Sequence, residues 1–214
     1  MTKPLAIITG ASRGLGYALA EALSDTHHIL AVARTTGALE ELDDAIKARG
    51  GDATLAPMDI TNRDAMALLC RSVHDRWGGA ALWVHTAVHA APLSPAHHIE
   101  QKDWQKTVAT NLDSMGHLLP FIAALLGTTG KAVFFDDGFA GQKFFGAHAA
   151  TKAGQLALVR SWQAESAANG PEIYILSPRA MNTSLYRRFF PGADPASLAR
   201  PADEAARLLP QILD

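Results

Sequence analysis

The chain has 214 residues, of which 48% are hydrophobic and 19% charged, and its formal net charge is −2 at pH 7. At about 150 residues per domain, this length predicts a single domain over residues 1–214 with a substantial core. The near-neutral charge gives no basic footprint for nucleic acid, and no apolar run reaches the roughly 18 residues that span a bilayer. The sequence therefore predicts small-molecule partners, with no nucleic acid and no membrane among them.

The first apolar run begins directly after Met-Thr-Lys-Pro, with no segment typical of a signal peptide, which predicts a cytoplasmic protein. Cys70 is the only cysteine, so no disulfide can form within the chain. Its position in a helical pattern favours a small buried hydrophobic side chain over a nucleophile.

Short apolar runs typical of β-strands alternate with longer helical patterns along the whole chain. Strands are predicted at residues 5–9, 28–33, 53–57, 81–86, 131–136 and 172–176. Helices are predicted at residues 14–25, 37–49, 62–77, 100–126, 145–168 and 202–213. Because such alternation favours parallel strands joined by right-handed crossovers, we expect a Rossmann-type, doubly wound parallel α/β sheet of about six strands, with helices on both faces.

A glycine-rich turn joins the first strand to the first helix, and residues 9–16 read Thr-Gly-Ala-Ser-Arg-Gly-Leu-Gly. Glycines there let the backbone approach a pyrophosphate closely, and the first N–H groups of the helix face its negative charge. Such a turn alone is weak evidence, but the strand before it and the helix after it favour a dinucleotide site over an ordinary tight turn. The predicted cofactor contacts in this turn are Gly10, Ser12, Arg13, Gly14, Leu15 and Gly16.

Arg34 follows the second strand, where many NAD-specific folds carry an acidic residue that bonds the ribose 2′-hydroxyl. Arg34 and Arg13 instead favour a 2′-phosphate and so predict NADP(H), unless both are solvated surface charges. Asp59 follows the third strand, where it can accept a hydrogen bond from an adenine amino group. Its alternative role is the N-cap of the helix that begins near residue 62.

These motifs resemble the short-chain dehydrogenase/reductase family, and the resemblance covers nearly all of the chain. Asn111 in Asn-Leu-Asp-Ser matches the family's helix-four asparagine, and Lys152 in His-Ala-Ala-Thr-Lys matches its active-site lysine. Residues 177–183 resemble the segment that clasps the nicotinamide carboxamide, with Arg179 where glycine is usual. The resemblance implies a hydride-transferring reductase with a nicotinamide cofactor. It extends the predicted cofactor contacts to Asp59, Ile60, Thr86, Ala87, Lys152, Pro178 and Thr183.

The positions that carry proton transfer in the family differ in this chain. The resemblance implies a tyrosine four residues before Lys152, where this sequence has His148. It also implies a serine after the fifth strand, where residues 134–138 read Phe-Phe-Asp-Asp-Gly and the register is uncertain by one residue. The turn after the fourth strand is likewise altered, to His-Thr-Ala-Val-His at residues 85–89.

Two hypotheses account for this pattern. In the first, the site is rebuilt: His148 supplies the proton as hydride arrives, Asp137 orients its ring, and Lys152 and Asn111 complete the catalytic set. The charge of Lys152 opposes a charged imidazole unless it is directed to the ribose hydroxyls. In the second, the protein binds NADP(H) without turnover, as a sensor or scaffold. Catalysis is slightly favoured because two compatible residues occur together at the two replaced positions.

The nine histidines raise the question of a metal site. We expect His85, His89 and His148 near one another, and three imidazoles can bind zinc. Their spacing is not diagnostic, and no cysteine or carboxylate set accompanies them, so the sequence predicts no metal.

Residues 183–192 follow the last strand, where the resemblance implies a mobile substrate lid. The leucine, tyrosine and phenylalanine side chains of this segment, together with Phe139, Phe144 and Phe145, suggest an apolar pocket wall. The predicted substrate is therefore a small hydrophobic carbonyl compound or the corresponding alcohol.

The resemblance implies a seventh strand after the last predicted helix, and this sequence predicts that it is missing, together with the tetramer contact that depends on it. Helices 100–126 and 145–168, which pair across a two-fold axis in the family, predict a homodimer, unless their apolar faces point into the core. Those faces consist of Leu112, Met115, Leu119, Leu156, Val159 and Trp162.

Overall fold

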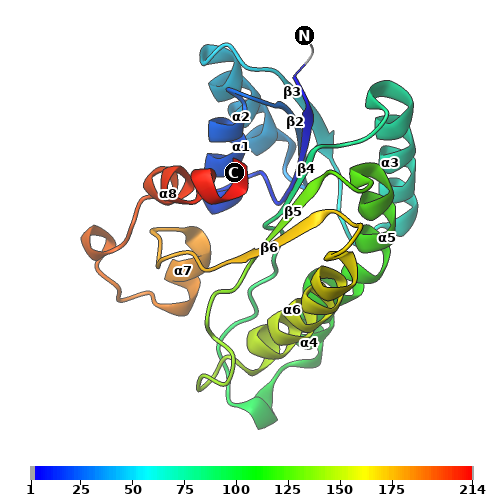
Figure 1. The fold of residues 1–214 in the computed structure, drawn as a ribbon. Coiled ribbons are helices and arrows are strands. Elements are labelled where there is room, and N and C mark those ends of the chain that lie inside the picture. The colour runs from blue at the N-terminus through cyan, green and yellow to red at the C-terminus, as the bar shows by residue number, and fades with distance from the viewer. Residues whose placement is uncertain (1–2, 214) are drawn as a thin grey trace.

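Six parallel strands form one sheet at the centre of the computed structural model, which describes residues 3–213 (Figure 1). The strands are β1 Leu5–Thr9, β2 His28–Ala33, β3 Ala53–Pro57, β4 Leu82–His85, β5 Lys131–Phe135 and β6 Glu172–Leu176. They lie side by side in the order β3-β2-β1-β4-β5-β6. Because the chain builds outward from β1 in one direction and from β4 in the other, a crevice is expected where the carboxyl ends of these two strands meet.

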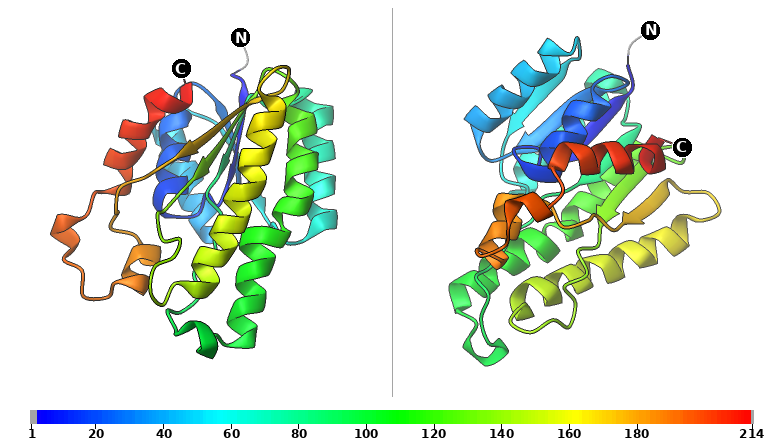
Figure 2. Two further views of the ribbon diagram at one scale, coloured as in Figure 1. Left: turned by 60° about the horizontal axis from the view of Figure 1, so that its bottom comes forward. Right: turned by 90° about the vertical axis from the view of Figure 1, so that its left-hand side faces the viewer.

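Helices cover both faces of the sheet (Figures 1 and 2). They are α1 Gly14–Leu23, α2 Thr36–Ala48, α3 Arg63–Trp77, α4 Gln101–Val108, α5 Met115–Leu126, α6 Gly146–Ser166, α7 Ser184–Phe189 and α8 Pro201–Leu213. Three short elements complete the chain: 3₁₀ turns at Ala96–His98 and Pro195–Ser197, and a π-helical turn at Ala109–Asp113. The Rossmann-type fold predicted from the sequence is confirmed, and residues 1, 2 and 214 of the predicted domain lie outside the described residues.

Alternate side chains of each strand enter two separate cores. Ala6 and Ile8 of β1 pack with the apolar sides of α1, α2 and α8. Leu5 and Ile7 of the same strand pack with α3, α5 and α6 on the opposite face. Successive side chains of a strand point to opposite faces, so a strand buried on both faces is expected to be largely apolar, as β1 is from Leu5 to Ile8.

The predicted helix 100–126 is not continuous. It is divided into α4, the π-helical turn and α5, and the N–H of Ser114 bonds the carbonyl of Ala109, five residues back. The wider turn contains Asn111, whose side chain is completely buried and bonded to the loop after β4. Apolar periodicity did not reveal this interruption, because the residues on both sides of it keep helical spacing.

The apolar faces that predicted the dimer point mostly inward. Met115, Leu119, Leu156 and Val159 are buried in the chain's own core, because α5 and α6 cover the sheet. The prediction that these residues form an intermolecular surface is therefore wrong. The large apolar side chains left exposed on α4 and α6 are Trp104, at 38%, and Leu158, at 39%.

Strand β6 is one edge of the sheet, and residues 3–213 contain no strand beyond it. The chain instead continues through α7 into α8, which packs against α1 on the other side of the molecule (Figure 2). None of the helices in the described part of the chain is both long and apolar enough to cross a membrane.

A buried carboxylate fixes α8 to the connection between β6 and α7. Glu204 is fully buried and accepts hydrogen bonds from the backbone N–H of Arg179 at 2.9 Å and from its Nε at 2.6 Å. Arg207 adds a third donor at 2.5 Å, and its guanidinium also bonds the carbonyl of Ser177 at 3.2 Å. The hydrogen bond from Arg207 is the main cause that lowers the pKa of Glu204 to about 2. Arg179, which stands where the resemblance implied glycine, thus has a structural partner.

We expect Glu204→Gln to lower the free energy of unfolding by about 2 kcal/mol, because hydrogen bonds to an ionised acceptor contribute more than those to an amide. In a chain of this size, that loss corresponds to a fall of roughly 4–8 °C in the thermal midpoint. The carboxylate stabilises the fold fully above its ordinary pKa of 4.5, and this contribution disappears as the pH falls toward 2. The difference in the free energy of unfolding between the parent protein and Glu204→Gln should therefore shrink over that pH range. Asp203→Asn is the control, because this exposed neighbour forms its ion pair with Arg200 and not with Arg207. An equal effect of both substitutions would contradict the role of Glu204.

Candidate functional site

The turn between β1 and α1 has the geometry of an anion cradle. Gly10 and Gly14 have φ values of +92° and +58°, which side chains disfavour. A Cβ at Gly10 would lie 2.5 Å from the backbone nitrogen of Ala87. Arg13, the N-cap of α1, makes no side-chain capping bond, and none of the hydrogen bonds within the described residues uses the N–H groups of residues 14–16. These N–H groups and the positive end of the helix dipole are free to bind phosphate oxygens.

Thr86, the first residue after β4, fixes the shape of this turn. Its hydroxyl donates to the carbonyl of Thr9 at 2.9 Å, and a Cβ built on Gly16 would lie 2.3 Å from that hydroxyl oxygen. Thr183 lies on the other side, where its methyl group would be 3.3 Å from a Cβ at Gly14. The predicted cofactor residues Thr86 and Thr183 are therefore in contact with the glycine turn, although they are far from it in sequence.

Arg34 and Asp59 lie together at the end of β2. Arg34 Nη1 is 3.7 Å from Asp59 Oδ2, and the two side chains are 58% and 41% exposed. Asp59 Oδ1 accepts hydrogen bonds from the backbone and hydroxyl of Thr61. The alternative role of Asp59 as helix N-cap is wrong, because Asn62 caps α3 by accepting from Ala65 N at 3.0 Å.

The remaining predicted cofactor contacts differ in their exposure. Arg13 is exposed, whereas Ser12, Ala87 and Pro178 are partly buried. Leu15 and Ile60 are buried in the core, so only their backbone atoms are available to a ligand. The carbonyl of Ile60 is already bonded to His117 Nε2 at 2.8 Å.

The Asn111 side chain is buried and holds other parts of the protein together, so it is not exposed to a ligand. Its side-chain oxygen accepts from the backbone N–H of His89 at 2.7 Å, and its amide donates to the carbonyl of His89 and to the hydroxyl of Thr151. These bonds tie the loop after β4 to α6. Every polar atom of the Asn111 side chain is thereby used within the protein.

Lys152 begins a buried chain of hydrogen bonds. Its ammonium donates to Gln155 Oε1 at 2.7 Å, and Gln155 Nε2 lies 3.3 Å from His85 Nε2. His85 Nδ1 is 2.8 Å from the hydroxyl of Thr9, at the carboxyl end of β1. Since Gln155 donates at Nε2, His85 must accept there and carry its proton on Nδ1. Burial, with a smaller effect of Lys152, lowers the pKa of His85 to about 3, and burial also lowers the pKa of Lys152.

Asp137 and His148 form a close pair at the carboxyl end of the sheet. His148 Nε2 lies 2.6 Å from Asp137 Oδ2, and the two side chains are 1% and 25% exposed. His148 Nδ1 is buried without a hydrogen-bond partner among the described residues. The carboxylate, and not the imidazole, is thus the polar group of the pair that faces outward.

The ionised form of Asp137 is favoured overall. Burial raises its pKa, but the hydrogen bond from His148, the charge of His148, the charge of Lys152 and the backbone N–H of Phe139 outweigh this and lower it below the usual value. The second carboxylate, Asp136, lies 3.6 Å from Arg160.

Aromatic side chains surround this pair. Phe145 and Phe189 are buried, and the ring centroid of Phe189 lies 5.0 Å from that of His148. Phe139 stacks on Phe145 at 4.3 Å, and Phe190 lies 5.9 Å from Phe139. The segment 183–192 thus contributes an aromatic wall, as expected, and part of it forms the helix α7, which the sequence did not predict.

Two of the three histidines considered as zinc ligands, His85 and His148, are instead hydrogen-bonded to other side chains of the protein. His85 is bonded to Thr9 and Gln155, and His148 is bonded to Asp137. Within residues 3–213, no group of three or more histidine, cysteine, aspartate or glutamate side chains is arranged to hold a metal ion.

Gln155 and Glu204 were not singled out from the sequence. Gln155 lies three residues after Lys152, and helical side chains at this spacing share a face, so this signal was available. Glu204 carried the same helical spacing toward Arg207, but its contact with Arg179, 25 residues away in the sequence, had no local signal.

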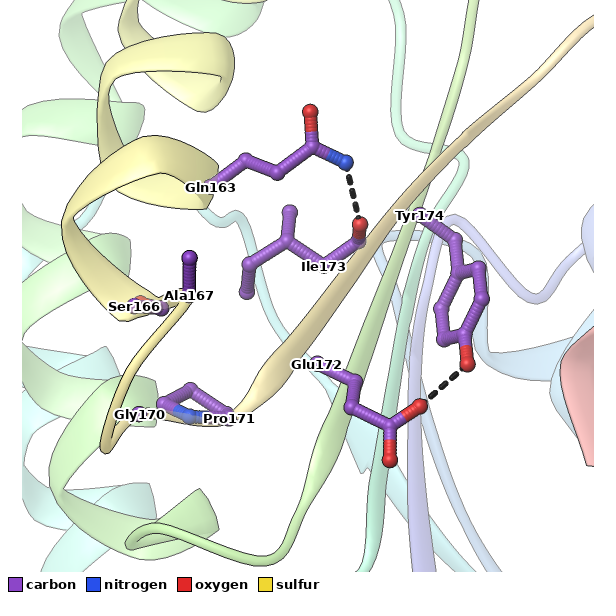
Figure 3. A pocket seen from close by; sticks show the side chains of 8 residues that line it. All are labelled: Gln163, Ser166, Ala167, Gly170, Pro171, Glu172, Ile173 and Tyr174. Carbon is purple, nitrogen blue, oxygen red and sulfur yellow. Dashed lines mark hydrogen bonds between the residues drawn. The ribbon is translucent and has the colours of Figure 1, made fainter.

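Two surface hollows lie away from this site. One of about 300 Å³ lies between β6 and the end of α6, where Gln163 bonds the carbonyl of Ile173 (Figure 3). The other, of about 940 Å³, is lined by Leu5 and His28 at the amino ends of β1 and β2. Neither contains any of the predicted site residues.

Comparison with known proteins identifies a family for this architecture. The family model described as short chain dehydrogenase matches residues 4–193. An uncharacterised oxidoreductase of Listeria monocytogenes is 30% identical over 191 residues, covering 84% of this chain and 75% of that protein. The 3β-hydroxysteroid dehydrogenase 1 of Eggerthella lenta is 29% identical over 220 residues, covering 95% of this chain and 78% of that protein.

Solved structures show the same fold. A short chain dehydrogenase from Pseudomonas syringae has a TM-score of 0.89 at 21% identity, covering 97% of this chain and 89% of its own. A metagenomic short-chain oxidoreductase in complex with NADP has a TM-score of 0.84 at 23% identity, covering 100% of this chain and 91% of its own.

Gly16→Ala is expected to destabilise the protein, because the new methyl group would lie 2.3 Å from Thr86 Oγ1 and 2.4 Å from the carbonyl of Gly10. We expect a loss of about 1–3 kcal/mol in the free energy of unfolding, measured by denaturant titration. Gly37→Ala is the matched control, since Gly37 lies in α2 and a Cβ added there would have no neighbouring atom within 4 Å. Gly37→Ala should leave the free energy of unfolding unchanged or raise it slightly. Equal stability of the two variants would refute the close contact.

Proposed function

The chain belongs to the short-chain dehydrogenase family, and we propose that it transfers hydride between NADP(H) and a small, largely apolar substrate. The glycine turn carries this proposal. Its glycines let the turn pack closely against Thr86 and Ala87, and the N–H groups of residues 14–16 stay free for a pyrophosphate at the carboxyl end of β1. Asp137 follows β5, so the Asp137–His148 pair also lies at the carboxyl ends of the strands. A phosphate site and an ionisable pair that both lie at the carboxyl ends of the strands favour an oxidoreductase over a nucleotide sensor.

The residues that would hold the cofactor come from several elements. The N–H groups of residues 14–16 would bind the pyrophosphate, and Arg34 and Arg13 the 2′-phosphate. Lys152 would reach the ribose hydroxyls, while Pro178 and Thr183 would border the nicotinamide. When bound, the cofactor supplies or accepts the hydride.

The two side chains at the proposed reaction centre, Asp137 and His148, have different roles. Asp137 is the group that meets the substrate, because its carboxylate is partly exposed while the His148 ring is enclosed. His148 donates from Nε2 to Asp137 Oδ2 and holds the carboxylate in place, which makes it a positioning residue. Any proton that His148 gives to a substrate must pass through Asp137.

Calorimetric titration tests the cofactor. We expect NADPH to bind at least about tenfold more tightly than NADH, because Arg34 adds a charge-assisted contact to the 2′-phosphate. Arg34→Ala should remove this preference and leave NADH binding unchanged. Arg71→Ala, at an exposed position on α3, is the control. Binding of neither nucleotide would reject the proposed function.

We also propose a homodimer formed through the outer faces of α4 and α6, where Trp104 and Leu158 are exposed. Leu158→Arg should convert the dimer to a monomer, because it places an unpaired charge in the interface. Leu68→Arg, at a leucine of α3 that is 62% exposed, is the control. Light scattering after size exclusion measures the mass, and a monomeric parent protein or a dimeric Leu158→Arg variant would contradict this interface. The cytoplasmic location stays a prediction.

A further inference from the structure

We propose that this site acts on an iminium ion, a substrate whose reacting carbon is part of a cationic C=N⁺ group, with the carboxylate of Asp137 and the aromatic side chains beside it binding the positive charge. This inference rests on the proposed hydride transfer and names its substrate class.

The group that faces the substrate is an acceptor only. Asp137 Oδ2 accepts from His148 at 2.6 Å, and Oδ1 accepts from the N–H of Phe139 at 3.3 Å. Both contacts orient the carboxylate, and neither supplies an outward-facing donor. An ionised carboxylate presented in this way attracts cations and hydrogen-bond donors.

This arrangement opposes carbonyl reduction. Hydride arriving at a carbonyl carbon leaves negative charge on the oxygen, which catalysis must stabilise with a donor. A carboxylate beside that oxygen raises the barrier. Lys152 is the nearby cation that acts on Asp137, but its ammonium is bonded to Gln155 at 2.7 Å.

The aromatic side chains of residues 183–192 and Phe139 also favour a positively charged substrate. Phe139, Tyr186 and Phe190 are partly exposed, and Phe190 lies 4.8 Å from Tyr186 and 5.9 Å from Phe139 between ring centroids. The faces of aromatic rings attract cations, and they do so most strongly where water is excluded. A carboxylate next to several aromatic rings is thus complementary to an apolar cation.

The reaction balances without a proton donor. Hydride from NADPH forms a C–H bond at the iminium carbon, the π electrons of C=N move to nitrogen, and the products are a neutral amine and NADP⁺. No group in the site has to deliver a proton, so the enclosed position of His148 is no obstacle. The reverse reaction oxidises the amine with NADP⁺.

The first test compares two bicyclic substrates of similar size. N-methyl-3,4-dihydroisoquinolinium is permanently charged, and 1-tetralone is its neutral ketone counterpart. We expect NADPH oxidation with the iminium at a kcat/KM at least about tenfold above that with the ketone. Asp137→Asn should remove most of this activity, because it leaves Lys152 to repel the cation. Asp75→Asn, on the exposed surface of α3, is the control.

The second test measures binding without turnover. N,N-dimethyl-1,2,3,4-tetrahydroisoquinolinium keeps the charge and cannot accept hydride. Calorimetry with the full chain, with and without NADPH, should show binding that weakens about tenfold or more in Asp137→Asn. The Asp75→Asn control should bind like the parent protein.

The outcomes separate this inference from the proposed function. Turnover of the ketone without turnover of the iminium would overturn the inference and keep the hydride transfer. NADPH binding with no turnover of either compound, and no binding of the quaternary cation, would overturn the inference, whereas the proposed function is rejected if neither nucleotide binds. Iminium turnover that survives Asp137→Asn unchanged would remove the carboxylate from the mechanism and overturn the inference.

Discussion

The close approach of two turns organises this molecule. Gly10 and Gly16 lie so near the turn after β4 that an added Cβ would collide with Thr86 or with the backbone of Ala87. This contact can form only if β1 and β4 are neighbours, which places the reversal of strand order at the glycine turn. The same glycines that allow the contact also expose the N–H groups of α1, so the packing requirement and the phosphate cradle share one cause.

Polar side chains below this turn form a second, buried layer. Thr9, His85 and Gln155 connect β1, β4 and α6 through hydrogen bonds and end at Lys152. A buried network of this kind stabilises the fold only when every member is satisfied, and the proton on His85 Nδ1 satisfies this one. Lys152 is therefore held from inside the protein, and its charge reaches the site from a fixed position.

The sequence predicted those features that depend on local chemistry. Strand and helix alternation gave the fold, and the residues before Lys152 and after β5 pointed to His148 and Asp137. Features that depend on long-range packing were missed. Periodicity showed that Met115 and Val159 were apolar, but it did not show that they faced the sheet. Asp59 was the cap candidate for α3, but Asn62, three residues further along the chain, caps the helix by accepting from the N–H of Ala65.

The residues at positions 137 and 148 depend on each other. An imidazole is short, and rings of Phe145 and Phe189 cover it, so its Nε2 can reach only a neighbouring protein group. Without Asp137, a buried N–H would lack a partner. Without His148, the carboxylate would lose its closest donor and its fixed orientation. Each single replacement therefore costs free energy that the double replacement avoids, as expected for side chains in direct contact. A vestigial site carries no such requirement, because a solvated aspartate and an apolar residue would serve the fold equally well.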